Sequence, residues 1–171
     1  MRSRLKADLR ITIGVDRMNH WLLKSEPEIF GIDALAAAPR KTTSWNGVRN
    51  YQACNTLRDS IKKGDQAFFY HSSCAIPGIA GIVDIVRGAY PDETAFDPKS
   101  EYYDADSKRE SPRWYAVDVR LVRKFKHIIS LDQLRAHQAA TLADLLVLRR
   151  GNRLSVTPVA RKDWDFILSL E

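Results

Sequence analysis

The sequence of 171 residues contains little cysteine and no long apolar run. Its two cysteines, Cys54 and Cys74, form no Cys-x-x-Cys pair and have no histidines at metal-binding spacing. We therefore expect reduced thiols and a cytoplasmic protein, or a nuclear one in a eukaryote. No stretch approaches the roughly 18 consecutive apolar residues that cross a bilayer, so we expect no membrane partner.

Recognisable catalytic motifs are also missing. The sequence has no Gly-x-Ser-x-Gly, no P-loop and no dinucleotide-binding fingerprint, because the glycines at 78 and 81 lead into a predicted strand rather than a helix. Four histidines are scattered without carboxylates at metal-binding spacing, namely His20, His71, His127 and His137. We therefore predict no catalytic residue, no metal site and no cofactor.

Positive charge is in modest excess. Lys and Arg outnumber Asp and Glu by 27 to 21, which gives a net charge of +6 and permits attraction to polyanions. Residues 1–17 hold five of the basic side chains and two of the acidic ones, and they lack hydrophobic periodicity. We predict that they form a flexible N-terminal extension and that residues 18–171 form a single domain, which is long enough for its own core.

Hydrophobic patterning predicts an α+β fold. Strands are expected at 20–24, 65–71, 79–87 and 114–125, with a further candidate at 154–156. Helices are expected at 29–36, 51–63, 131–137, 142–148 and 161–170. A long polar loop should follow residue 87. This order of elements is typical of a mixed sheet curled into a small pseudo-barrel with short helices around it.

The segment 44–51 concentrates side chains that suit a flat, polar-edged ligand. Trp45 offers a flat apolar face, while Asn46, Arg49 and Asn50 can supply directional hydrogen bonds. The alternative is a helix entry in which Asn50 caps the following helix and Trp45 packs beneath it. Both interpretations can hold, because a loop fixed by a helix N-terminus often positions a binding group.

Five stretches resemble, in order, the motifs of the EVE domain family. They are WLLKSEP (21–27), WNGVRNYQA (45–53), FYHS (69–72), PGIAG (77–81) and PRWYAVDV (112–119). The resemblance extends from about Trp21 to Leu170. It implies a PUA-like fold, related to PUA and YTH domains, with a pocket for modified bases of DNA or RNA. The family usually has Asp at the position of Asn46 and Arg at that of Cys54, so the polar edge of the pocket is expected to differ.

The resemblance and the residue chemistry together give a candidate site. An unstacked base needs an aromatic face, which is worth about 1–3 kcal/mol per base, and Trp45 is the candidate for that face. Arg49 is expected either to contact phosphate or to brace the loop. His71 ends an aromatic strand and is either a pocket group or a structural histidine. The full candidate ligand-binding set is Lys24, Ser25, Trp45, Asn46, Gly47, Val48, Arg49, Asn50, Tyr70, His71, Ser72 and Gly78.

The favoured hypothesis is a non-catalytic module that recognises a modified nucleobase in an aromatic-walled pocket. Its partner would be DNA or RNA that carries the modified base, and a monomer is the favoured state. One alternative is an enzyme acting on a nucleotide or modified base, with Lys24 or His71 as acid or base. Another is a small-molecule sensor that uses the same pocket. The absence of recognisable catalytic motifs from the sequence favours the non-catalytic binding module.

Overall fold

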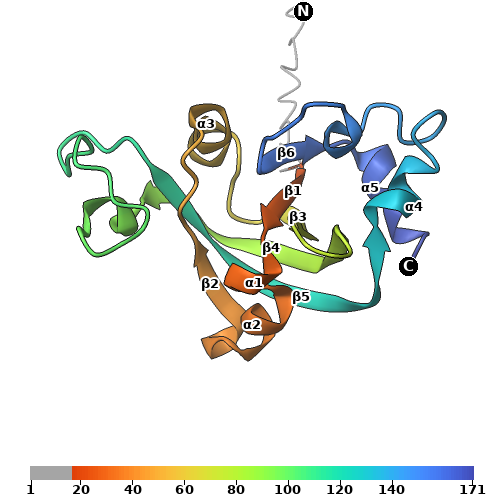
Figure 1. Ribbon diagram of the computed structural model, residues 1–171, viewed down its shortest axis with the longest axis horizontal. Coiled ribbons are helices and arrows are strands. Elements are labelled where there is room, and N and C mark those ends of the chain that lie inside the picture. The colour runs from red at the N-terminus through yellow and green to blue at the C-terminus, as the bar shows by residue number, and fades with distance from the viewer. Residues whose placement is uncertain (1–16) are drawn as a thin grey trace, which may run out of the picture.

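A six-stranded mixed sheet forms the framework of residues 17–171, which are the residues that the computed structural model describes (Figure 1). Its strands are β1 (His20–Ser25), β2 (Thr42–Trp45), β3 (Gln66–His71), β4 (Gly78–Pro91), β5 (Tyr115–Ser130) and β6 (Val156–Val159). They lie in the order β2-β5-β4-β3-β1-β6. β1 and β3 run parallel, and the other neighbours pair antiparallel.

The predicted α+β class is confirmed, although this sheet does not close and leaves β2 and β6 as edges. The predicted extension 1–17 lies outside the described residues except for Arg17.

Side chains of β1 and β3 alternate between two hydrophobic cores. Leu23 and Phe69 belong to a first core, and Leu22 and Phe68 belong to a second one on the opposite face. This follows from the two-residue period of a strand. Because both faces are covered, apolar residues succeed one another without polar interruptions, and this pattern predicted both strands correctly.

Short helices cover the two faces of the sheet. They are α1 (Pro27–Phe30), α2 (Ile32–Ala37), α3 (Tyr51–Asp59), α4 (Leu131–Arg135) and α5 (Arg161–Leu168), with 3-10 turns η1 (Pro39–Lys41), η2 (Glu93–Phe96) and η3 (Leu146–Leu148). α3 packs against β4, β5 and β6, while α4 and α5 lie at the other end of the molecule in Figure 1. None of the helices within residues 17–171 is long and apolar enough to cross a membrane.

Two of the helix predictions are wrong. The helix expected at 29–36 is interrupted at Gly31, whose extended backbone ends α1 and precedes α2. The helix expected at 142–148 consists of turns followed by η3. Its apolar residues Leu142, Leu145 and Leu148 are nonetheless buried. Their spacing of three residues is the period of 3-10 turns, which explains why the pattern was mistaken for a helix.

Strand boundaries also differ from the prediction. β2 was not predicted, because three of its four residues are polar Thr or Ser, and Trp45 therefore ends an edge strand rather than lying in a loop. The candidate strand at 154–156 is found at 156–159 instead. β4 and β5 extend well beyond the predicted ranges, to Pro91 and Ser130 respectively.

The long strands β4 and β5 curve because their pairing slips at several β-bulges. At Gly78 they approach so closely that a Cβ atom would lie 2.3 Å from the carbonyl oxygen of Ile129. Only glycine fits there. The close approach places the start of β4 beside the end of β5. Directly after β5, Leu131 donates its backbone N–H to the carbonyl of Pro77.

Trp164 belongs to the second core, and its substitution tests how much that core contributes to stability. Its ring is 4% exposed and stacks on Phe68 with centroids 3.9 Å apart. We predict that Trp164→Ala lowers the free energy of unfolding by about 3–5 kcal/mol, measured by urea denaturation, because a large buried ring is removed. Val122→Ala is the control, since Val122 is 45% exposed, and it should cost less than about 1 kcal/mol. Equal losses in the two variants would contradict this assignment of the core.

Candidate functional site

A cavity of about 470 Å³ opens where the end of β2 and the loop after it meet the end of β1 and helix α1. This volume lies in the range of small-molecule and cofactor sites. Eight predicted site residues line it, namely Lys24, Ser25, Trp45, Asn46, Gly47, Val48, Arg49 and Asn50. The other lining residues are Glu26, Ile29, Phe30, Thr43, Ser44, Glu101, Tyr102 and Ser155. The structure thus brings together the residues of two predicted motifs and adds a third segment near Tyr102.

Trp45 belongs to the wall of the cavity and to the first core at the same time. It pairs with Val117 across β2 and β5, and its ring meets Phe69 edge-on with centroids 5.3 Å apart. Only 7% of Trp45 is exposed. The helix entry weighed as an alternative is also present, because the Asn50 side chain accepts a hydrogen bond of 3.0 Å from the backbone N–H of Ala53 at the start of α3.

Tyr102 forms a second aromatic side of the cavity. Its ring lies against Gly47, where a Cβ atom would come within 2.8 Å of the ring carbons, and Gly47 also has a positive φ of 76°. Glycine is therefore required at this position for two reasons. The sequence did not single out Tyr102, because it lies in a long polar segment without periodicity. A pair of adjacent tyrosines, 102 and 103, was the one signal available there.

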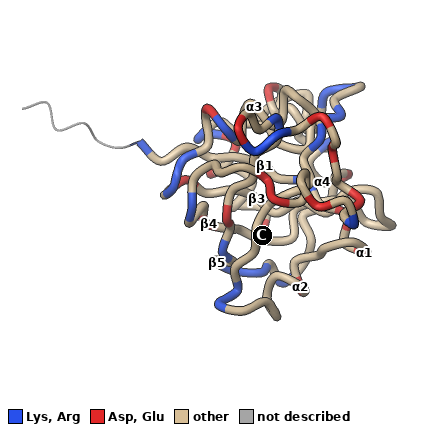
Figure 2. The backbone as a smooth tube through the Cα atoms, turned by 90° about the vertical axis from the view of Figure 1, so that its left-hand side faces the viewer, with Lys and Arg blue, Asp and Glu red and all other residues tan. Residues whose placement is uncertain are grey.

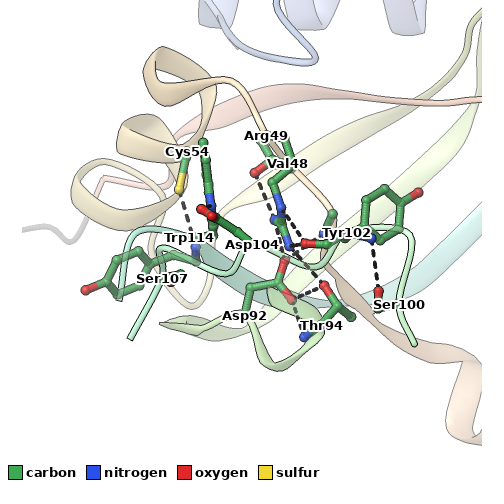
Figure 3. Close-up of polar contacts among 12 residues, drawn as sticks. Val48, Arg49, Cys54, Asp92, Thr94, Ser100, Tyr102, Asp104, Ser107 and Trp114 are labelled. Atoms are coloured by element: carbon green, nitrogen blue, oxygen red, sulfur yellow. Dashed lines mark hydrogen bonds and ion pairs between the residues drawn. The ribbon is translucent and has the colours of Figure 1, made fainter. Parts of the chain in front are cut away.

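Arg49 ties the loop to the segments that contain Asp92, Thr94 and Tyr102 (Figure 3). Its guanidinium pairs with the Asp92 carboxylate at 2.9 Å and donates two hydrogen bonds, of 2.6 and 3.0 Å, to the carbonyl oxygen of Tyr102. It also donates to Thr94 at 3.2 Å and lies over the Trp114 ring, 5.2 Å from the centroid. Of the two roles predicted for Arg49, the structure places it in the bracing one.

Asp92 is the fully buried partner of this brace. It accepts hydrogen bonds from the backbone N–H of Gly47 at 2.8 Å and from the backbone N–H and hydroxyl of Thr94 at 2.9 and 2.6 Å, in addition to Arg49. Burial alone would raise the pKa of the Asp92 carboxyl, but these donated bonds outweigh it and lower the pKa. Asp92 therefore stays ionised and holds the loop and the segment after β4 together.

Cys54 lies on α3 and does not line the cavity. Its sulfur accepts a hydrogen bond of 3.3 Å from the backbone N–H of Tyr115 and is buried. Burial raises the pKa of this thiol, so it remains protonated. The family difference expected at Cys54 thus falls at the contact between α3 and β5, whereas the one at Asn46 falls on the cavity itself.

The polar edge of the cavity has groups that no residue of the described part of the chain pairs with. Lys24 is half-buried, which lowers its pKa, and no carboxylate within residues 17–171 forms an ion pair with it. Asn46 is exposed and makes no side-chain hydrogen bond to any described residue. The Ser25 hydroxyl donates to the Phe30 carbonyl at 2.6 Å and retains its acceptor capacity. A ligand can therefore find both donors and acceptors here.

The remaining four predicted residues do not line this cavity. Tyr70 and Ser72 line a separate groove, which shares Lys24 with the cavity. His71 is 9% exposed, and its Nε2 accepts a hydrogen bond of 3.1 Å from the backbone N–H of Ile32. Gly78 lies at the close approach of β4 and β5. The placement of His71 and Gly78 favours structural roles. No group of three or more metal-ligating side chains gathers within the described part of the chain.

His71 makes stability depend on pH. Burial lowers its pKa below 6.5, so the unfolded chain binds a proton more readily than the folded one. The folded state should therefore lose stability as pH falls from about 7 toward the lowered pKa, because a proton on Nε2 removes the acceptor for Ile32. We predict that the difference in unfolding free energy between the parent and His71→Leu shrinks over that range in urea titrations. A difference that is constant with pH would contradict this.

The ion pair between Arg49 and Asp92 gives a second prediction about stability. Asp92→Asn removes the charge opposite Arg49 while it keeps the shape of the side chain. We expect the free energy of unfolding to fall by about 3–5 kcal/mol, because a half-buried guanidinium loses its partner. Asp97→Asn is the control, since Asp97 is exposed, and it should change stability by less than about 0.5 kcal/mol. Thermal and urea unfolding of the two variants measure this.

Known proteins are similar to this chain in sequence and in fold. Residues 19–170 match the family model described as the EVE domain. Thymocyte nuclear protein 1 of Gallus gallus is 49% identical, with 89% of this chain and 68% of that protein covered, and the Homo sapiens protein is 48% identical, with 90% and 74% covered.

Solved structures superimpose along most of the chain. A Pseudomonas syringae protein is 48% identical with a TM-score of 0.83, over 88% of this chain and 98% of that one. Human THYN1 protein, crystallised in complex with DNA containing 5-methylcytosine, is 47% identical with a TM-score of 0.84, over 89% and 96%. The resemblance carried by the five sequence motifs is therefore confirmed, and so is the fold expected from it.

Proposed function

We propose that this chain, which belongs to the EVE domain family, binds a modified base of DNA or RNA in the cavity beside Trp45, with 5-methylcytosine in DNA as the first candidate. The observation that carries the proposal is the cavity itself, because it combines two aromatic sides with polar groups that have no partner among the described residues. The human THYN1 complex with DNA containing 5-methylcytosine supports the choice of ligand.

The physical chemistry of the cavity suits a flat base. A base that leaves the stack loses contacts with its neighbours, and the rings of Trp45 and Tyr102 can replace them at about 1–3 kcal/mol per base. Lys24 and Asn46, which have no polar side-chain partner within residues 17–171, can then bond to the polar edge of that base. A methyl group adds an apolar contact worth about 1–3 kcal/mol, which sets the discrimination to be expected against the unmodified base.

An enzymatic role receives less support from the geometry. Of the two residues considered as acid or base, His71 is bonded to Ile32 and does not line the cavity, which leaves Lys24. A lysine whose pKa is lowered by burial can serve as a base, but it can equally hold a polar edge or a phosphate. The human THYN1 protein binds DNA in its crystal structure, so a binding module remains the function proposed.

Calorimetric titration tests the proposed function directly. We expect an oligonucleotide with one 5-methylcytosine to bind about tenfold or more tightly than the same strand with cytosine. Binding of the strand should weaken steeply as salt rises, because counterions are released from the phosphates. Equal affinity for the two strands would overturn modified-base recognition. Binding of the free nucleoside as tight as that of the strand would indicate a small-molecule sensor instead.

Asn46 offers a sharper test of the cavity than Trp45, because Trp45→Ala would also remove core contacts. We predict that Asn46→Ala lowers affinity for the 5-methylcytosine strand several-fold and leaves the melting temperature unchanged, since the side chain is exposed. Asn55→Ala is the matched control, because Asn55 is an exposed asparagine on α3 that lines no cavity described here. Equal affinities of the two variants would remove Asn46 from the site.

A further inference from the structure

The cavity has a neighbour on the opposite face of the sheet. A groove of about 600 Å³ lies between the end of β3 and the segment 147–152, and Lys24 lines both the groove and the cavity. Lys24 and Tyr70 are partners in the β1–β3 ladder, and Ser25 and His71 follow them. Because successive side chains point to opposite faces, the two hollows meet at the carboxyl ends of β1 and β3.

The lining of the groove is basic. Lys24, Arg135, Arg149 and Arg150 contribute to it, and none of its lining residues is acidic. Over the rest of the described chain, basic and acidic segments are interspersed (Figure 2). Arg135 lies 3.7 Å from the exposed Asp132, whereas Lys24, Arg149 and Arg150 form no ion pair within residues 17–171. Four positive charges thus converge on one surface, and three of them have no ion-pair partner among the described residues.

The segment that carries the two adjacent arginines is held in place. The Asn152 side chain donates to the carbonyl of Leu146 at 2.6 Å and accepts from the backbone N–H of Leu154 at 2.9 Å. The turn is closed by a hydrogen bond from the N–H of Asn152 to the carbonyl of Arg149 at 3.1 Å. Gln138 donates to the carbonyl of Leu148 at 3.1 Å from the neighbouring α4 region. The groove is therefore formed before any ligand arrives.

Tyr70 supplies a neutral donor to the same groove. Its ring is buried in the second core, and its hydroxyl makes no hydrogen bond to any residue of the described chain. Burial raises the pKa of Tyr70 to about 12, so the hydroxyl keeps its proton at neutral pH. A protonated hydroxyl beside these cations can donate to an oxyanion, whereas a basic or purely apolar ligand edge would leave the cations unmatched.

We propose that this groove binds the sugar-phosphate backbone of the same strand whose modified base enters the cavity, with Arg149 and Arg150 as the main phosphate contacts. This inference rests on the proposed function. The strand would pass over the ends of β1 and β3, with the base on one face of the sheet and the adjacent phosphates on the other. Lys24 would lie between them, at the point where the base leaves the backbone.

The test is a double variant with a matched control. Arg149→Ala/Arg150→Ala removes two exposed arginines from the groove, and Lys62→Ala/Lys63→Ala removes two adjacent exposed lysines that line neither hollow. Each protein is titrated with four ligands over a range of salt. They are a single strand with one 5-methylcytosine, the same strand with cytosine, the free 5-methylcytosine nucleoside and its 5′-monophosphate.

We expect the arginine variant to bind both strands at least tenfold more weakly at low salt and to lower the salt slope by about 1.4, as two lost phosphate contacts on a single strand should. Its affinity for the nucleoside should equal that of the parent. The proposal is overturned if the arginine variant behaves like the lysine control. It is also overturned if the monophosphate loses as much affinity as the strands, because the groove would then hold a free nucleotide.

The two proposals can fail separately. If the parent does not prefer the modified strand, the proposed function fails, while the cytosine strand still reports on the groove. Circular dichroism melts check that the variants fold, and Arg135→Gln gives an independent variant on a different element. It should lower the salt slope by about 0.7 and spare the nucleoside. An unchanged slope in both groove variants would contradict the proposal.

Discussion

The buried pair between Arg49 and Asp92 holds together three segments that are distant in the sequence. Asp92 binds the loop after β2 through Gly47 and the turn after β4 through Thr94, while Arg49 binds the carbonyl of Tyr102. Removal of either charge would leave the other one desolvated and unpaired, which costs more than the pair itself contributes. The walls of the cavity depend on this one contact, although the pair itself lies outside the aromatic surface that a base would meet.

The parallel pair of β1 and β3 provides the second constraint. Both strands are buried on both faces, so their ends cannot shift without moving two cores. Lys24 and Ser25 at the end of β1, and Ser72 directly after β3, are therefore placed by strands that are anchored in both cores. A site built on such ends loses little conformational entropy on binding, because its backbone is already ordered before a ligand arrives.

The sequence predicted the part of the cavity lining that depends on local pattern. Trp45, Asn46 and Arg49 lie in one recognisable stretch, and Asn50 caps the helix that follows it. The sequence could not show that Asp92 and Tyr102 complete the site. They lie more than forty residues away in a polar segment without periodicity, and only tertiary contacts bring them to the loop.

The errors in the predicted strands and helices have similar causes. β2 is a short edge strand of polar residues and owes its place to pairing with β5 rather than to its own hydrophobicity. Leu142, Leu145 and Leu148 are buried as the pattern predicted, yet their turns are too tight for an α-helix. His71 was left open between two roles, because a strand end can point either into a pocket or against a neighbouring helix, and here it meets Ile32.

Arg49 holds Tyr102 through the backbone carbonyl, which accepts two hydrogen bonds, and its guanidinium also lies 5.6 Å from the centroid of the Tyr102 ring. Another side chain at position 102 would therefore keep both hydrogen bonds, provided that the new group lies flat against Gly47. Related chains could exchange this one side of the cavity while the same arginine and aspartate keep the rest of the fold unaltered. The surface offered to a ligand and the hydrogen bonds that hold the loop in this sense come from different atoms of a single residue.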